Sequence, residues 1–290
     1  MKKFFVGALM VLGLTSQSQA QISRVFVAVT GNDSNDCLQP AASCRTLNAA
    51  IGKVDSGGEV IVIETGSYAG ATITKSVKIN VPSGAVAFSA LTLLINAGPS
   101  DVVVVRGATL KALTVGSGNG IDVQSAGTVF VENCVIDGWA NGINVATGAR
   151  VDIKDTTLRS NNNGVMVTSA GAVVSADQVR AIRNGVGVSG AAFQLNAGSA
   201  TIGRSLLAGN ENGAVAMGSS SLMISRSQIS GQAANGMQVG ASATGRITDS
   251  IVAGNLTGLS NAGTLVSLGN NALSGNTTNT TGTITTGALQ

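Results

Sequence analysis

Apolar and polar residues alternate along most of the chain in short runs separated by glycine and asparagine. Ile121 and Val123 share one parity around Asp122, and the same pattern returns at Ile143 and Val145. A period of two places successive side chains on opposite faces, as in a β-strand with one buried face. Segments with the longer period of a helix are missing from this region, so the alternation predicts many short strands.

Asn-Gly pairs mark a regular repeat of these strands. The pairs are Asn119-Gly120, Asn141-Gly142, Asn163-Gly164, Asn184-Gly185, Asn212-Gly213 and Asn235-Gly236. Counted on to Gly258, successive glycines lie 22, 22, 21, 28, 23 and 22 residues apart. A second and a third apolar segment follow in each unit, so three strands and their turns fill one repeat. The sequence therefore predicts an all-β fold, a right-handed parallel β-helix solenoid of about ten rungs, each strand pairing with its copy in the next turn.

We expect the Asn-Gly pairs to form a structural ladder at one tight corner of the coil. Glycine permits the positive φ of such a corner. Asparagine tolerates the left-handed region, and its amide can bond a stacked copy of itself. The step of 28 residues contains the segment from Gly190 to Leu195, which is predicted to bulge as a loop from one rung. The role of this expanded rung stays open.

Residues 1–20 have the pattern of a signal peptide. Two lysines precede an apolar run from Phe4 to Leu14, and Ser18-Gln19-Ala20 offers the small residues of a cleavage site. The run is too short for a permanent membrane helix, and no later stretch is apolar for long enough. We therefore expect an exported protein, periplasmic or extracellular, with no membrane span in the mature chain.

Residues 21–58 are predicted to form a cap on the coil. The segment from Arg24 to Val29 is expected to be a strand, and residues 46–54 have the apolar face of a short helix that plugs the bore. Between them lie Cys37 and Cys44, which we expect to form a disulfide in an exported protein. The coil itself is assigned to residues 59–275. Residues 276–290, rich in Thr, Gly and Asn, form a ragged strand or a disordered tail.

The charge balance excludes two classes of partner. The chain has 17 Lys+Arg and 14 Asp+Glu, and without Lys2 and Lys3 the balance is 15 against 14, or +1. So small a net charge is not typical of a nucleic-acid-binding protein, and the sequence has no basic cluster that would bind a membrane surface. Apolar residues make up 44% of the chain, enough for a large core. Cys134 lies in a strand pattern and is predicted to be a buried, inert thiol.

The stretch GNDSNDCLQPAASCRTLNAAIGKVDSGGEVIVIETGSY, followed by TITKSVKIN, resembles the opening of bacterial right-handed β-helix repeat proteins of the pectate-lyase-like superfamily. The resemblance covers Arg24 to about Asn276. It implies the fold and a secreted location. Many proteins of this kind have no established activity, so the resemblance implies little chemistry.

The enzymes known on this fold give tests for an active site. Polygalacturonase-like hydrolases use a histidine in their groove, and this chain has none. The same absence excludes Ser-His-Asp and Cys-His nucleophiles. Lyase-like members hold calcium with several carboxylates, but Asp122, Asp137 and Asp152 fall on different strands and do not converge. We expect no metal site and no cofactor, with calcium only if the protein is a lyase.

Charged residues are expected to stabilise the coil. A column of polar residues precedes the third strand of each rung: Asn133, Asp155, Asp177, Arg204, Arg226 and Asp249. The expected pairs between rungs are Asp177–Arg204, Arg226–Asp249, Glu132–Lys154 and Asp137–Arg159. Exposed pairs contribute only about 0–1 kcal/mol each, so their clearer role is to fix the register of the strands.

Trp139 is the one candidate for sugar stacking, because it is the only tryptophan and lies at a corner between two rungs. Asp137 and Arg159 are expected nearby, and the three residues form the candidate ligand site. The alternative is a Trp folded over the corner as part of the core.

Two functions stay open at this point. The favoured one is a non-catalytic secreted β-helix that serves as a surface, adhesion or glycan-interaction module, with a polysaccharide or cell-surface glycan as partner. The alternative is a polysaccharide lyase or related enzyme that modifies uronate polymers, which rests on the fold alone. The sequence gives neither the ligand nor the oligomeric state.

Overall fold

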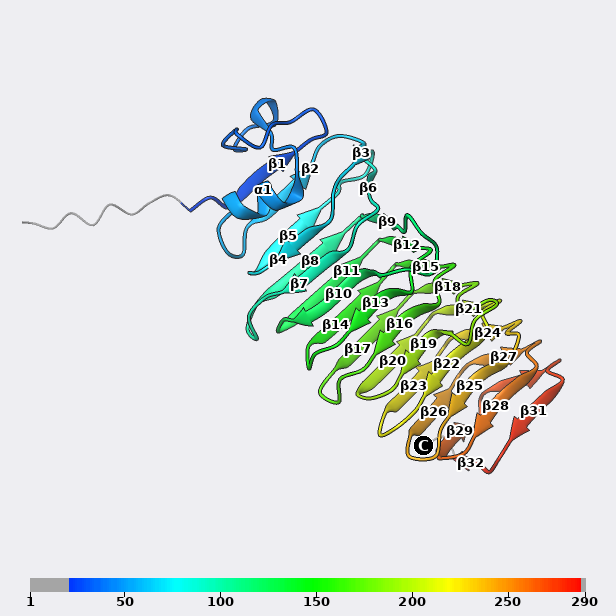
Figure 1. The fold of residues 1–290 in the computed structure, drawn as a ribbon. Helices are drawn as coiled ribbons and strands as arrows, with labels where there is room; N and C mark the ends of the chain where they lie inside the picture. The colour runs from blue at the N-terminus through cyan, green and yellow to red at the C-terminus, as the bar shows by residue number, and fades with distance from the viewer. Residues whose placement is uncertain (1–20, 288–290) are drawn as a thin grey trace, which may run out of the picture.

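The chain coils into three parallel β-sheets that run the length of a rod (Figure 1). A computed structural model describes residues 21–287, so the predicted signal peptide lies outside the described residues. Each turn contributes one strand to sheet A, one to sheet B and one to sheet C. With ten strands in each of sheets B and C, the predicted parallel β-helix of about ten turns is confirmed.

The strands of the three sheets have the following bounds. Sheet A contains β1 (Arg24–Val27), β2 (Glu59–Val62), β5 (Val77–Asn80), β8 (Val102–Arg106), β11 (Thr128–Glu132), β14 (Arg150–Lys154), β17 (Val173–Asp177), β20 (Ser199–Gly203), β23 (Ser221–Ser225), β26 (Thr244–Thr248), β29 (Thr264–Leu268) and β32 (Ile284–Gly287). Sheet B contains β3 (Gly66–Ser67), β6 (Ala87–Ser89), β9 (Thr109–Lys111), β12 (Val135–Asp137), β15 (Thr157–Arg159), β18 (Arg180–Ile182), β21 (Leu206–Ala208), β24 (Gln228–Ser230), β27 (Ile251–Ala253) and β30 (Ala272–Ser274). Sheet C contains β4 (Ala71–Ile73), β7 (Leu93–Asn96), β10 (Asn119–Ser125), β13 (Asn141–Val145), β16 (Asn163–Val167), β19 (Ala191–Leu195), β22 (Asn212–Ala216), β25 (Asn235–Val239), β28 (Thr257–Asn261) and β31 (Thr278–Thr281).

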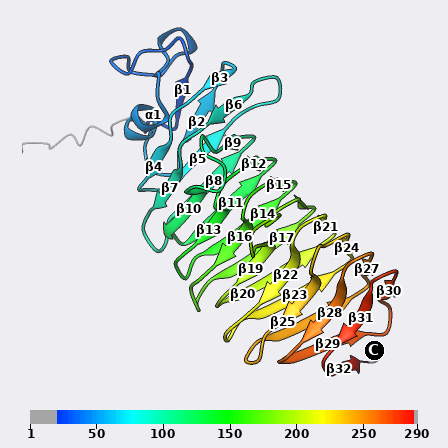
Figure 2. The ribbon, with the colours of Figure 1, turned by 45° about the vertical axis from the view of Figure 1, so that its right-hand side comes forward.

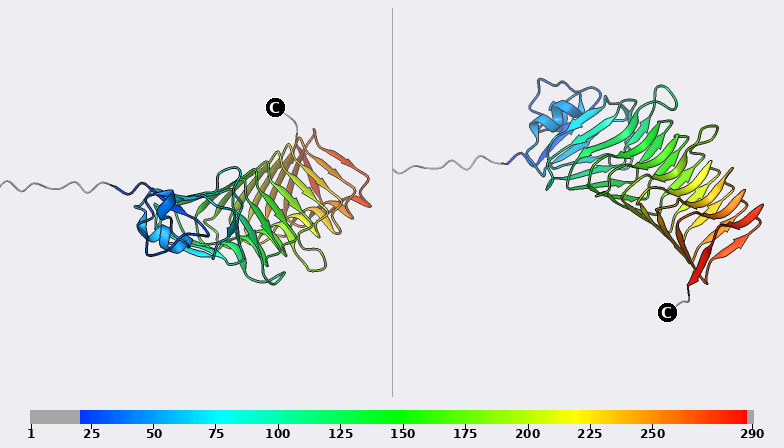
Figure 3. Two further views of the ribbon diagram at one scale, coloured as in Figure 1. Left: turned by 90° about the horizontal axis from the view of Figure 1, so that it is seen from above. Right: turned by 60° about the horizontal axis from the view of Figure 1, so that its bottom comes forward.

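The alternation in the sequence sets which face of each strand is buried. In β13, Ile143 and Val145 are fully buried while Asn144 between them is half-buried on the outside. Ile143 lies in register with Ile121 of the preceding turn and with Val165 of the next. Apolar side chains therefore stack from turn to turn along the bore. The rod has one continuous core and no separate domains along the coil (Figures 2 and 3).

A short helix covers the N-terminal end of the coil. Helix α1 (Leu47–Lys53) follows a one-turn 3-10 helix (Pro40–Ala42), and the hydroxyl of Thr46 caps α1 by accepting from the N–H of Ala49 at 3.2 Å. Its buried residues pack against β1, β2 and β4. The same end of the rod carries the disulfide loop between β1 and α1 (Figure 1).

At the other end, residues 278–287 take strand form. Strands β31 and β32 pair in parallel with β28 and β29 and continue sheets C and A beyond residue 275. Most of their residues are exposed. Of the two alternatives for the tail, the described part is therefore a strand.

The asparagines of the repeat bond to one another across the rungs. The amide of Asn141 donates to Asn119 at 2.9 Å, and the amide of Asn163 donates to Asn141 at 3.0 Å. Further along, the amide of Asn235 donates to Asn212 at 3.0 Å. These bonds join copies of one position in sheet C and hold the strands in register.

Apart from Gly185, the glycines of these pairs allow close packing between rungs, and the positive φ predicted for them is wrong. Gly120 and Gly142 lie inside β10 and β13 and do not have positive φ. A Cβ on Gly120 would lie 2.7 Å from the carbonyl oxygen of Gly142, and a Cβ on Gly142 would lie 2.6 Å from that of Gly164. The pair opens a strand rather than forming a turn, and adjacent rungs leave no room there for a side chain.

Contrary to our prediction, Asn184 and Gly185 do not belong to this ladder. Asn184 is fully buried in the turn between sheets B and C, and Gly185 has a φ of +72° in the same turn. The ladder position of this rung is taken by Ala191, whose N–H donates to Asn163 at 3.2 Å. The inward residue of β18 is Ala181, which lies in register with Leu158 and Leu207.

The loop predicted from Gly190 to Leu195 is therefore wrong. Residues 191–195 form β19, and Phe193 is fully buried in register with Val165 and Ala214. The additional residues of the long step lie earlier, in the turn of residues 183–190.

Candidate functional site

The corner between sheets A and B carries a column of residues in the left-handed conformation. These residues are Gly107, Asn133, Asp155, Gln178, Arg204, Arg226 and Asp249. Asp177 was predicted to belong to this column, but it is the last residue of β17, in register with Lys154 and Gly203. The left-handed backbone conformation costs glycine little free energy, but it costs other residues about 1–2 kcal/mol. Asparagine and aspartate tolerate it best, so the arginines here are exceptional.

A shallow open groove of about 540 Å³ runs along this corner. Its walls are formed by two parallel columns, the left-handed residues of the corner and the first residues of the sheet B strands. Residues from these columns are Gln178, Arg204, Arg226 and Asp249 on one side and Arg180, Leu206, Gln228 and Ile251 on the other. Rungs are about 4.8 Å apart, so the groove presents guanidinium groups at one-rung intervals. We call it the arginine groove.

One of these arginines has a carboxylate partner. Arg204 forms an ion pair with Asp177, as predicted, and Arg159 pairs with Asp137 at 3.2 Å. Among residues 21–287, no ion pair joins Arg226 to Asp249, and Glu132 pairs with Arg106 instead of Lys154. Arg106 lies one turn before Glu132 in register. The groove therefore keeps an excess of positive charge.

Trp139 lies in the core and is not available for sugar stacking. Its side chain is 4% exposed, and its indole N–H donates to the carbonyl oxygen of Leu110 at 3.2 Å. Its backbone N–H donates to the amide oxygen of Asn161 at 2.9 Å. Trp139 is thus the first member of a buried column whose later members are asparagines. Of the two expectations for Trp139, the one in which it folds over the corner as part of the core is the one observed. Asp137 and Arg159 pair on the outside of sheet B.

The three candidate calcium ligands lie on three different sheets. Asp122 on sheet C accepts a hydrogen bond from Asn144 at 2.7 Å, Asp152 on sheet A pairs with Arg150 at 2.8 Å, and Asp137 belongs to sheet B. Within the described residues, no three His, Cys, Asp or Glu side chains gather as metal ligands. These three carboxylates therefore do not converge on one calcium ion, as expected.

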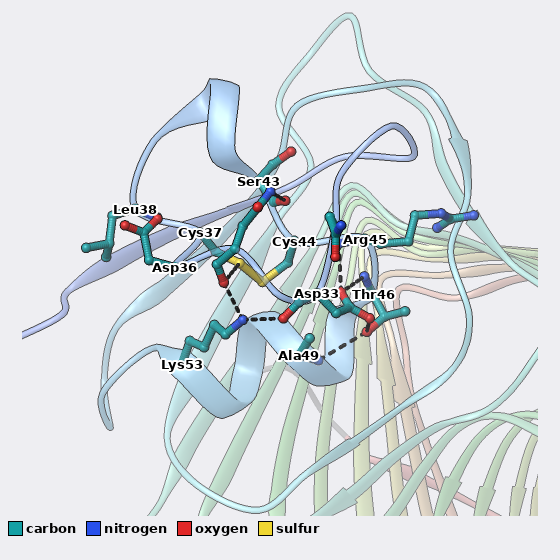
Figure 4. The surroundings of a disulfide bond; sticks show 12 residues. Asp33, Asp36, Cys37, Leu38, Ser43, Cys44, Arg45, Thr46, Ala49 and Lys53 are labelled. Carbon is teal, nitrogen blue, oxygen red and sulfur yellow. Dashed lines mark hydrogen bonds between the residues drawn. A yellow bond between two sulfur atoms is a disulfide. The ribbon is translucent and has the colours of Figure 1, made fainter.

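The disulfide loop is built around a lysine (Figure 4). The predicted disulfide between Cys37 and Cys44 is confirmed. Within this loop Lys53 extends from α1 and donates to the backbone carbonyl oxygens of Asp33 and Asn35. The carboxylate of Asp33 accepts from the backbone N–H groups of Arg45 and Thr46, each at 2.8 Å. The pKa of Asp33 is lowered, because these hydrogen bonds and the charge of Lys53 outweigh the effect of burial.

Cys134 is buried, as the strand pattern predicts. Burial raises the pKa of its thiol to about 12. It lies at the start of a column of turn residues that includes Thr156 and Ser205, and its N–H donates to the hydroxyl of Thr156 at 3.3 Å. The thiol is therefore an inert part of the core.

Comparison with solved structures finds a similar fold in the crystal structure of pectate lyase Pel9A. The TM-score is 0.58 at 17% sequence identity, and the match covers 87% of this chain and 69% of that chain. At this identity the likeness shows a pectate-lyase-like parallel β-helix, as the sequence resemblance implied. No curated protein matches the chain. No helix in the described residues is long and apolar enough to cross a membrane.

A family model described as periplasmic copper-binding protein (NosD) matches residues 96–288. The expectation of a protein without a cofactor is overturned by this description. Copper sites use imidazole, thiolate or thioether ligands, and the chain has no histidine. Of its cysteines, two form the disulfide and the third is buried with a raised pKa. Within the described residues, neither an imidazole nor an accessible thiolate is therefore present to bind copper.

The matched segment runs from the end of β7 to the last strand and includes the arginine groove and the asparagine ladder of sheet C. It covers most of the coil, and the family is described as periplasmic, which agrees with export. The chain belongs to the NosD family of parallel β-helix proteins.

Proposed function

We propose that the protein is an exported, periplasmic β-helix that binds an anionic glycan along the arginine groove without cleaving it. The proposal is supported above all by the position of Arg204 and Arg226 in the left-handed column at the corner between sheets A and B. Both have a φ of +48°, a conformation that other rungs assign to Asn133, Asp155 or Asp249. Strained positions are often kept for function, and here they direct two guanidinium groups to one groove.

The chemistry of the groove suits carboxylate or sulfate groups on a polymer. Arginine binds carboxylates with two parallel hydrogen bonds. Arg180, Arg204 and Arg226 come from successive rungs, so they present a row of charges about 4.8 Å apart. That interval is comparable to the length of one sugar residue, so neighbouring uronates of one chain can each meet an arginine.

Binding without cleavage is favoured by the carboxylates near the groove. Of the residues that line it, Asp249 is the one carboxylate, and Asp177 beside it is paired with Arg204. Calcium needs six to eight oxygen ligands, usually from several carboxylates. The lyase alternative has no comparable support from the side chains around this groove.

The proposal is tested by calorimetric titration of the protein with oligogalacturonate and with the same oligomer methyl-esterified. Hydrogen bonds to charged groups contribute about 1.5–3 kcal/mol each, so Arg204→Gln with Arg226→Gln should weaken binding of the acidic oligomer at least about tenfold. Arg226→Gly should lose affinity while unfolding at an equal or higher temperature, because glycine removes the backbone strain.

Arg150→Gln is the matched control, since Arg150 is equally exposed but lies on the outer face of sheet A beside Asp152. It should bind like the unchanged protein. Equal binding of acidic and esterified oligomers would contradict the proposal, as would release of unsaturated products when calcium is added.

A further inference from the structure

The corner between sheets B and C carries a row of exposed aliphatic side chains. The residues and their exposed fractions are Leu91 (53%), Leu113 (78%), Val115 (76%), Val186 (57%), Val188 (45%) and Leu256 (53%). Scattered exposed aliphatic residues are ordinary on a protein surface. Here six of them gather at one corner of the rod, on four of its turns, and apolar groups gathered in this way mark a place of interaction. We name this feature the aliphatic edge.

Two turns of this edge are longer than the others. Residues 112–118 join β9 to β10, and residues 183–190 join β18 to β19 (Figure 1). Three rungs separate them along sheet B, which is about 15 Å at the spacing of parallel strands. Both turns leave the coil at the same corner, so one flat surface can touch both tips.

Backbone hydrogen bonds fix the conformation of the two long turns, residues 112–118 and 183–190, whose outermost parts we call the tips. The N–H of Gly116 donates to the carbonyl oxygen of Gly138 at 2.8 Å, which ties the first turn to the next rung. In the second turn, the N–H of Val188 donates to Gly185 at 3.0 Å and that of Gly190 donates to Val188 at 2.8 Å. The aliphatic side chains are thus displayed by ordered backbone, and little ordering is needed when they bind.

The charges beside the tips are mostly positive. Lys111 directly precedes the first turn and Arg183 opens the second, and both are exposed. Arg45 shares a hollow of about 550 Å³ with Leu91 and Leu113. On the turns of this edge, Glu211 is the one carboxylate among the described residues. The charge balance of the whole chain gave no sign of this, because the fold brings together cations that are far apart in the sequence.

The shape and composition of the edge favour a lipid surface over a protein. Protein interfaces are enriched in aromatic residues set in well-packed pockets. Phe88 of sheet B lies beside Leu113 at a hollow of about 450 Å³, but the exposed apolar side chains of the two long turns themselves are all aliphatic. Aliphatic side chains inserted between lipids with cations at the headgroups are the usual means of peripheral membrane binding. We propose that the aliphatic edge binds the surface of an anionic phospholipid bilayer, with Leu113, Val115, Val186 and Val188 inserted among the lipids.

The test is flotation of the full chain, without its first 20 residues, with vesicles of phosphatidylglycerol and phosphatidylcholine in equal parts and with vesicles of phosphatidylcholine alone. The protein should float with the anionic vesicles. The pair Leu113→Asp and Val115→Asp should lower the bound fraction about tenfold or more, and Val186→Asp with Val188→Asp should act in the same direction.

Val173→Asp with Met223→Asp is the matched control, because these residues are 43% and 38% exposed on the outer face of sheet A. This variant should float like the unchanged protein, and circular dichroism should show that all variants are folded. No flotation with anionic vesicles, or unchanged flotation of both tip variants, would overturn the proposal. So would a shift from dimer to monomer in sedimentation when the tips are changed, since the edge would then be a contact between copies.

This membrane contact is independent of the arginine groove, which lies at the opposite side of sheet B. The tip variants should keep their affinity for oligogalacturonate, and Arg204→Gln with Arg226→Gln should keep at least half of its flotation. If one variant lost both activities and its circular dichroism spectrum changed, that variant would be unfolded. The variant with Val186→Asp and Val188→Asp would then decide whether the edge binds vesicles.

Discussion

Lys53 takes the place that a bound cation occupies in many acidic loops. Its ammonium group lies between the carbonyl oxygens of Asp33 and Asn35, while the carboxylate of Asp33 turns to the backbone N–H groups that precede α1. The loop of residues 30–46 is thus closed by one salt-like network and one disulfide. The segment GNDSND looks acidic in the sequence, but its own lysine supplies the positive charge.

This network predicts a pH dependence. Because the pKa of Asp33 is lowered in the folded chain, its stabilising effect is present above the unfolded value of about 3.9. It is lost as the pH falls through the lower folded value. Hydrogen exchange of the Arg45 and Thr46 amides, corrected for intrinsic rates, should show protection at neutral pH that disappears in strong acid. Asp33→Asn should lower the protection already at neutral pH, and protection that does not change with pH would contradict this account.

The turns between sheets B and C contain a buried column of amides. Its members are Asn161, Asn184, Asn210, Gln232 and Asn255. Each satisfies backbone groups that the turn leaves without a strand partner. Asn184, for example, donates to the carbonyl oxygen of Leu158 at 3.0 Å and accepts from the N–H of Asn161 at 3.1 Å. All buried side-chain polar atoms of residues 21–287 have a partner, which explains how a core this rich in amides is stable.

Replacing Asn184 should therefore be costly. Asn184→Leu removes the partners of Asn161 and Asn210 and leaves backbone groups unsatisfied, at about 1–3 kcal/mol for each. Urea unfolding should show that the free energy of unfolding falls by roughly 2–4 kcal/mol. Asn163→Ala, in the half-buried ladder of sheet C, serves as the comparison and should cost at most about 1.5 kcal/mol. Equal shifts for both variants would mean that the buried column adds no more than the outer ladder.

The two asparagine columns explain where sequence reasoning succeeded and where it failed. Period-two alternation and the Asn-Gly spacing predicted the coil, its strands and the cap, because burial and close packing leave a strong pattern. The segment Asn161-Asn162-Asn163 contributes to two columns, Asn161 to the buried column in the turn and Asn163 to the ladder of sheet C. In the next rung only Asn184 is present. Since both columns use asparagine, the pair Asn184-Gly185 was assigned to the wrong one.

The site was harder to predict than the coil. Arg204 and Arg226 stood out in the sequence as a charged column, but only as partners for Asp177 and Asp249. The left-handed backbone and the neighbouring column with Arg180 become visible only when the corner is built. Trp139 attracted attention because it is unique, yet its large ring simply fills the place that asparagine takes in later rungs.

At the scale of the whole molecule, each rung contacts mainly its two neighbours, as in other solenoids. Removal of one complete repeat should then be tolerated. Deletion of residues 141–162 joins Ala140 to Asn163, which lies in register with Asn141. We expect a folded protein with circular dichroism per residue unchanged and a melting temperature lower by a few degrees. Deletion of residues 134–154 is one residue shorter than a repeat and leaves three residues instead of two in the tight corner between β11 and β15. The one-residue excess turns the faces of the following strand out of register, so this variant should aggregate or unfold at a much lower temperature.

The narrow sheet B separates the two proposed surfaces. Its strands are two or three residues long, so the arginine groove and the aliphatic edge run along its two borders, parallel to the axis of the rod. A rod that lies on a bilayer along one border leaves the other free for a polymer. The regular repeat thus provides two long, linear surfaces that a compact domain of this size would not offer.

The Asn-Gly pairs have one more consequence, which concerns the ageing of the protein. In a flexible chain the glycine nitrogen readily attacks the side-chain carbonyl of the preceding asparagine, and the resulting succinimide opens to aspartate or isoaspartate. In the coil the amides of Asn119, Asn141 and Asn163 are held by one another, and the glycines are fixed in strands. When one of these rungs opens, it exposes one such site. Deamidation therefore leaves a lasting chemical record, rung by rung, of where the coil has come apart.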